Sequence, residues 1–103
     1  MDPFVSKKVK DLLITVYDIN VYDIIGAYMG FNKSYDAYIY FQTDAELHAM
    51  TAAKKEEIQA IYIDYLKKCG HMPNEIETVR FYFDSDENVQ ANYGGNYFHA
   101  TRA

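Results

Sequence analysis

The side chains of this chain that could bind a soft metal ion are one cysteine and three histidines. Cys69 and His71 are one residue apart, a spacing that could place two ligands together at a helix end. A structural zinc site needs four ligands, usually supplied as two such pairs, and neither His48 nor His99 completes a second pair. A nucleophilic cysteine would need an adjacent base. Cys69 falls on the apolar side of a predicted helix, so we expect it to be buried and inert. We accordingly expect the chain to have no catalytic residue and no cofactor.

Residues 84–88, Asp-Ser-Asp-Glu-Asn, carry oxygen atoms of the kind that bind calcium. They lack the twelve-residue spacing, the central glycine and the terminal bidentate glutamate of a calcium-binding loop. We therefore expect these residues to form a turn between two strands.

Aromatic residues give the strongest signal for binding. The chain has eleven tyrosines and six phenylalanines but no tryptophan. Tyr38 and Tyr40 flank an isoleucine, and Tyr82 lies between two phenylalanines, so alternation in a strand predicts that these three tyrosines share the face opposite the core. Tyr93 follows in the last strand-like stretch. A tyrosine ring buries much area at low entropic cost, which is why binding surfaces use it often.

Negative charge accompanies these tyrosines. The net charge of the chain is −5, which disfavours nucleic acid because its phosphates require a basic surface. Residues 74–98 hold five acidic residues and a single basic one, Arg80. We expect an acidic rim around the tyrosines, formed by Asp36, Asp84, Asp86 and Glu87. Such a face attracts a basic partner and speeds its approach.

Helical signals occur in two regions. Asp2-Pro3 is typical of a helix start, and apolar residues then recur at helical spacing, which predicts a helix over 3–17. Thr43 with Glu46 matches a capping box and opens a second helical region that ends at Gly70. Its pattern is weak around Thr51, so the main helix could begin there.

Four strand-like stretches remain, over 22–31, 35–42, 75–84 and 89–93, and pairing could resume over 96–99. The order α-β-β-α-β-β predicts one α+β domain over residues 1–103. We expect a four-stranded antiparallel sheet of two hairpins with two helices on one face. The longest apolar run is too short to span a bilayer, and the N-terminus lacks the features of a signal peptide. These features favour a cytoplasmic protein.

Two aromatic strand pairs carry a resemblance to a known class. Residues 35–41 (Tyr-Asp-Ala-Tyr-Ile-Tyr-Phe), a charged amphipathic helix, and then residues 79–83 and 89–93 are similar in plan to small bacterial immunity proteins. The similarity is to YezG-type antitoxins and to immunity proteins of contact-dependent inhibition systems. It implies a cytosolic, non-enzymatic protein that binds and neutralises one cognate toxin, which could be a nuclease.

The sequence leaves two other classes open. The same sheet face could be buried against a second copy of the chain, which would make it a homo-oligomeric structural or adaptor domain. A small ligand-binding domain or enzyme could instead have a pocket lined by Tyr28, Met29 and Phe31.

Overall fold

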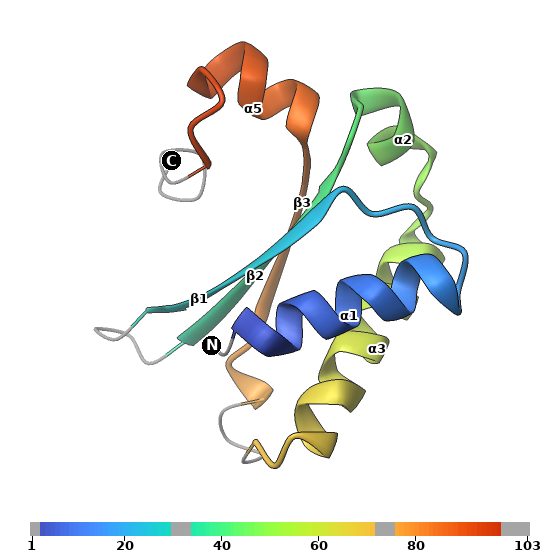
Figure 1. Cartoon of the computed structure of the whole chain (residues 1–103), viewed down its shortest axis with the longest axis vertical. Helices are drawn as coiled ribbons and strands as arrows, with labels where there is room; N and C mark the ends of the chain where they lie inside the picture. The colour runs from blue at the N-terminus through green and yellow to red at the C-terminus, as the bar shows by residue number, and fades with distance from the viewer. Residues whose placement is uncertain (1–2, 30–33, 72–75, 98–103) are drawn as a thin grey trace.

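A computed structural model describes residues 3–29, 34–71 and 76–97 of the chain (Figure 1). Four helices and three strands have both of their ends within these residues. In chain order they are α1 (Pro3–Thr15), β1 (Asp23–Met29), β2 (Ser34–Phe41), α2 (Asp44–Ala49), α3 (Ala52–Lys68), β3 (Arg80–Ser85) and α5 (Asp86–Tyr93).

The three described strands form one mixed sheet in the order β1-β2-β3. β1 and β2 are an antiparallel pair, with Ile24 opposite Ile39. β2 and β3 are parallel, with Tyr38 beside Tyr82. The predicted sheet of two antiparallel hairpins is therefore wrong, although the α+β class holds. The physical reason is that α2 and α3 lie between β2 and β3, and a helical crossover returns the chain to the starting end of the sheet.

The predicted fourth strand, over 89–93, is also wrong, because these residues belong to helix α5. Ser85 caps this helix: it has extended backbone angles and its Oγ accepts a hydrogen bond from the Asn88 amide at 3.0 Å. Gly94 ends the helix in the left-handed conformation, with a φ of 58°, which glycine adopts at little cost. Residues 84–88 are thus a strand end and a helix start, where we had expected a turn. β3 is also shorter than predicted, because Ile76 and Glu77 are helical.

The weak pattern near Thr51 marks a real break between two helices. Thr43 caps α2 by accepting from the Glu46 amide at 3.2 Å, and Thr51 caps α3 by accepting from the Lys54 amide at 3.1 Å. The buried residues of α3 are Ile58, Tyr62 and Leu66. Cys69 is the C-terminal cap of α3 and is exposed, so the expectation that it is buried is wrong.

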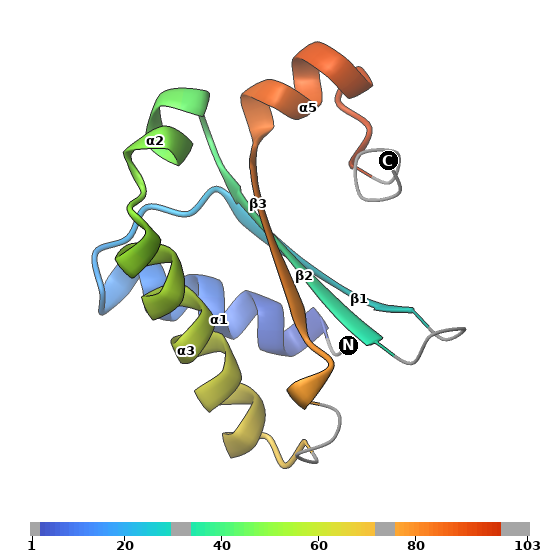
Figure 2. The same ribbon diagram turned by 180° about the vertical axis from the view of Figure 1, so that it is seen from behind.

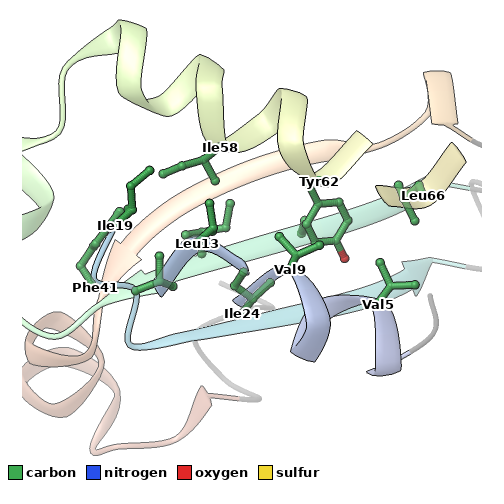
Figure 3. Packing of buried hydrophobic residues seen from close by; sticks show 12 residues of the cluster. Val5, Val9, Leu13, Ile19, Ile24, Phe41, Ile58, Tyr62 and Leu66 are labelled. Atoms are coloured by element: carbon green, nitrogen blue, oxygen red, sulfur yellow. The ribbon is translucent and has the colours of Figure 1, made fainter. Parts of the chain in front are cut away.

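The core lies between the sheet and the pair α1 and α3 (Figures 2 and 3). Ala37, Ile39 and Phe41 alternate along β2 and are fully buried on this face. α1 contributes Val5, Val9 and Leu13, and α3 contributes the three buried residues named above. Ser6 of α1 and the Tyr62 hydroxyl of α3 form a buried hydrogen bond of 3.0 Å. Both helices therefore cover one face of the sheet, and the residues of β2 between the core positions point to the other face.

Candidate protein-binding site

The sheet face turned away from α1 and α3 gathers tyrosines from several parts of the chain. Alternation along β2 and its register with β3 place Tyr38 and Tyr40 on the same face as Tyr82. α5 and the residues after it bring further rings to one end of this face. We call this surface the tyrosine face; its members are Tyr22, Tyr38, Tyr40, Tyr82, Tyr93 and Tyr97.

The centre of the tyrosine face is a stacked pair. The rings of Tyr38 and Tyr82 lie 5.0 Å apart between centroids and are inclined by only 16°. Tyr82 is 41% exposed, whereas Tyr38 is partly buried. Burial and the nearby Asp36 carboxylate raise the pKa of Tyr38, so its phenol stays neutral. Two stacked rings, one of them exposed, offer a rigid apolar platform with hydroxyl groups at its surface.

One end of the tyrosine face is closed by the C-terminal part of the chain. The Tyr97 ring meets the Tyr40 ring edge to face at 4.8 Å, and the Tyr97 hydroxyl donates a hydrogen bond to Asp86. Tyr40 is consequently buried, with 1% of its surface exposed. The expectation that Tyr40 lies open for binding is therefore wrong. Tyr93 lies on α5, where it is partly buried, and not on a strand.

Burial has a chemical consequence for Tyr40 and Tyr97. It raises the pKa of the Tyr40 hydroxyl, and the Asp84 carboxylate raises it further. Burial also raises the pKa of Tyr97, and the hydrogen bond to Asp86 adds to this effect because it favours the protonated phenol. Both side chains are neutral hydrogen-bonding groups at ordinary pH.

The opposite end of the tyrosine face contains an ion pair. The Nε atom of Arg80 donates to Asp36 Oδ1 at 3.1 Å, across the β2–β3 pairing. Asp36 is almost fully buried, whereas half of the Arg80 side chain is exposed. Asp36 is thus not part of an exposed acidic rim, and Arg80 presents positive charge beside the stacked rings.

The other three acidic residues of the predicted rim, Asp84, Asp86 and Glu87, form a cluster at the start of α5. Asp84 accepts hydrogen bonds from the Ser85 amide and the Asn88 side chain. Glu87 accepts from the Asp44 amide of α2 at 2.8 Å, and the Ser85 hydroxyl donates to the Asp44 side chain. Carboxylates are stabilised at helix N-termini by the unpaired amides there. These acids therefore stabilise the two helix starts and also give this end of the molecule its negative charge.

The structure thus brings together only part of the predicted site. Tyr38 and Tyr82 are adjacent and accessible, and Asp84, Asp86 and Glu87 cluster at the start of α5. Tyr22 was missed, although its amide continues the β1–β2 pairing by donating to the Tyr40 carbonyl at 2.8 Å. Tyr97 was missed, since its proximity to Tyr40 depends on the path of the chain after α5. The signal that could have revealed that path is the cap sequence, with Ser85 before two acids and Gly94 after the last helical residue.

Other chemistry finds no support in the part of the chain that the structure describes. No group of three metal-ligating residues occurs there. A groove of about 290 Å³ between α1 and α3 is lined by Leu12, Val16, Tyr17, Ile61, Tyr65 and neighbouring residues. It contains no nucleophile paired with a base. Of the predicted ligand pocket, Phe31 lies outside the described residues and the side chains of Tyr28 and Met29 are likewise not described.

Comparison with known proteins gives no relative from which a function could be carried over. No family model matches the chain, and no curated protein or solved structure matches it significantly. Across residues 3–29, 34–71 and 76–97, no helix is both long and apolar enough to cross a membrane.

Proposed function

We propose that this chain is a non-enzymatic immunity or inhibitor protein of the cytoplasm that binds a basic toxin through the tyrosine face. The observation that supports this most strongly is the stacked pair Tyr38–Tyr82 on the sheet face that the core helices leave free, where the Tyr82 ring is exposed. Rigid aromatic platforms of this kind are frequent anchors of protein interfaces. The bacterial immunity proteins that the sequence resembles suggest the toxin as partner.

Charge supports a basic partner. Asp84, Asp86 and Glu87 lie at the closed end of the tyrosine face, next to Asp44 of α2. The ion pairs formed among the described residues involve none of these four acids. Their charge is therefore not neutralised by a neighbouring lysine or arginine of the described chain, and it can steer a positively charged surface toward the stacked rings. A nuclease, whose cleft must be basic to bind phosphates, would fit such a face.

The experiment has two steps. Tagged protein captures a partner from the source cells at low and at high salt, and the captured protein is then produced separately for affinity measurement. We expect Tyr82→Ala to weaken binding on the order of 30-fold, about 2 kcal/mol, if Tyr82 is an interface anchor. Tyr17→Ala is the matched control, because Tyr17 has nearly the same exposure (43%) but lines the groove between α1 and α3.

Inhibition must follow binding for the proposal to stand. Stoichiometric wild-type protein should abolish the activity of the captured partner, and Tyr82→Ala should do so only at higher concentration. Equal affinity of both variants would move the interface away from the tyrosine face. A partner that is bound but remains fully active would exclude an inhibitor and favour an adaptor domain.

A further inference from the structure

Among the residues that the structure describes, strand β1 forms one edge of the sheet. Within the described chain, β1 pairs only with β2 and so leaves its outer row of backbone groups without a strand partner. Its sequence, Asp-Ile-Ile-Gly-Ala-Tyr-Met, has one charged residue at its first position and no proline. Natural edge strands usually carry charges, prolines or bulges that prevent pairing with another chain. β1 has none of these over residues 24–29.

The other edge strand, β3, carries charged residues, which oppose pairing with another chain. β3 carries Arg80 and Asp84 within a strand of six residues. Both α2 and α5 pack against β3 as well. α1 packs against β1 too, so the difference between the two edges lies in charge: β3 carries Arg80 and Asp84, whereas residues 24–29 of β1 carry no charge.

Side chains on both sides of the β1 edge are also apolar. The charge of Asp23 is balanced by Lys10 of α1, whose Nζ lies 3.8 Å from its carboxylate. Ile14 follows Lys10 by one helical turn, so it lies on the same side of α1, and it is 39% exposed. On the opposite face of the sheet Ile25 is partly exposed. An incoming strand would cover these two isoleucines.

We propose that two copies of this chain pair through β1, antiparallel and around a twofold axis, to form one continuous six-stranded sheet. The strand is self-complementary in this arrangement. Antiparallel pairing about Gly26 places the two Asp23 residues at opposite ends of the new ladder, about 20 Å apart, and each faces the apolar end of the partner strand. An uncharged edge offers nothing to select a foreign strand, whereas a second copy supplies the same apolar sequence in matching register.

This dimer is independent of the proposed function. A twofold axis perpendicular to the sheet keeps both tyrosine faces on the same side of the extended sheet. The stacked pairs Tyr38–Tyr82 lie on β2 and β3, one and two strands away from the new junction. They would remain open, so self-association and toxin binding can succeed or fail separately.

Sedimentation velocity of the purified chain, from about 1 to about 200 µM, tests the proposal through the concentration dependence of assembly. We expect a monomer–dimer equilibrium in the wild-type protein and a monomer for Ile25→Lys, since a charge on an edge strand opposes pairing. Val16→Lys is the matched control, because Val16 is the most exposed large apolar residue of the described chain (65%) and lies in the groove between α1 and α3. The Val16→Lys variant should remain dimeric.

Hydrogen exchange of the wild-type protein gives a second measurement that needs no variant. The outward amides of β1 should exchange more slowly at high than at low protein concentration, while those of α3 should not change. A chain that stays monomeric throughout this range would overturn the proposal. So would a dimer that persists in Ile25→Lys, or one whose concentration-dependent protection lies outside β1. A dimer lost in Tyr82→Lys but kept in Ile25→Lys would instead assign self-association to the tyrosine face.

Discussion

The tyrosines of this chain divide into two physical roles that their sequence positions do not distinguish. Tyr40 and Tyr82 both alternate with apolar residues in strands, yet Tyr40 is 1% exposed and Tyr82 is 41% exposed. The difference arises because Tyr97 packs on Tyr40, whereas Tyr82 stacks on Tyr38 and keeps its outer side in solvent. One ring therefore stabilises the fold, and the other is available to a partner.

A pair of substitutions checks this division. Tyr40→Ala removes a buried ring and should lower the free energy of unfolding by about 3 to 5 kcal/mol. Tyr82→Ala should lower it by about 1 kcal/mol or less, because much of that ring is already hydrated. Urea denaturation followed by circular dichroism measures both. Equal losses would show that Tyr82 is as important to the core as Tyr40.

Alkaline pH should destabilise the protein through Tyr40 and Tyr97. Their pKa values are raised in the folded protein, mainly by burial, above the unfolded value of about 10. A raised pKa means that folding favours the neutral phenol. The stabilisation is complete below about pH 10 and is lost as the pH rises toward the folded pKa.

Urea midpoints between about pH 8 and about pH 11 should therefore fall in the wild-type protein and fall less in Tyr40→Phe, which has no phenol to ionise at that site. Tyr17→Phe removes a hydroxyl from an exposed ring, and its urea midpoint should fall as much as that of the wild-type protein. An identical decline in all three proteins would assign alkaline sensitivity to other groups.

The Arg80–Asp36 pair should contribute more than an ordinary surface ion pair. Asp36 is nearly fully buried, so Arg80→Gln would leave its carboxylate without this charged donor, at a cost of about 1 to 3 kcal/mol. The exposure of Arg80 allows water to reach the site and keeps the cost below that of a fully buried pair. Lys68→Gln is the control, because its pair with Asp64 is exposed on both sides and should change stability by about 0.5 kcal/mol or less. Similar losses of unfolding free energy in Arg80→Gln and Lys68→Gln, measured by urea denaturation, would contradict this expectation.

At the level of secondary structure, the decisive element is α5. Residues 86–93 contain few apolar side chains, and only Val89 is buried. Such a short helix depends on its ends and its contacts more than on an apolar stripe. Ser85 is completely buried and its hydroxyl both accepts from the Asn88 amide and donates to Asp44 of α2. One side chain thus caps α5 and fixes it to α2.

Ser85→Ala should therefore destabilise the protein more than the loss of a helix cap that makes no other hydrogen bond. We expect about 1 to 2 kcal/mol, the upper part of the range for N-cap substitutions. Thr51→Ala, which removes an exposed cap from α3, should cost about 1 kcal/mol or less. Amide exchange should show faster opening of α5 in Ser85→Ala, and wild-type protection there would contradict the role of this hydroxyl.

At the level of the whole molecule, the parallel pairing of β2 and β3 determines where the negative charge lies. Parallel strands end at the same edge of a sheet, so α2 and α5, which follow them, begin side by side (Figure 1). Their first turns carry Asp44, Glu46, Asp86 and Glu87. A face with acids at one end and stacked rings at its centre is suited to steer a basic partner and then hold it.

Charge removal at this end should change the rate of association with that partner. Asp86→Asn with Glu87→Gln keeps hydrogen-bond acceptors in place but removes two negative charges. We expect the on-rate at low salt to fall by about threefold to tenfold, with less dependence on salt and little change in the off-rate. Asp64→Asn on α3 is the control and should leave the on-rate unchanged. Surface plasmon resonance at several salt concentrations measures each rate, and an unaltered on-rate in the double variant would contradict electrostatic steering.

Local patterns in the sequence determined much of this protein. Apolar spacing predicted α1 and the core face of β2, the Thr43–Glu46 capping box predicted the start of α2, and the weak pattern near Thr51 left open the break before α3, because these features depend on neighbours within a few residues. Strand direction did not follow from local pattern, since the 38 residues between Phe41 and Arg80, which include α2 and α3, separate β2 from β3. α5 carried a readable cap, but the stretch from Val89 to Tyr93 also fits a strand. Tertiary packing alone decided that Tyr40 is covered, that Asp36 is buried, and that Tyr82 is left open, because each outcome depends on which distant segment lies against the residue.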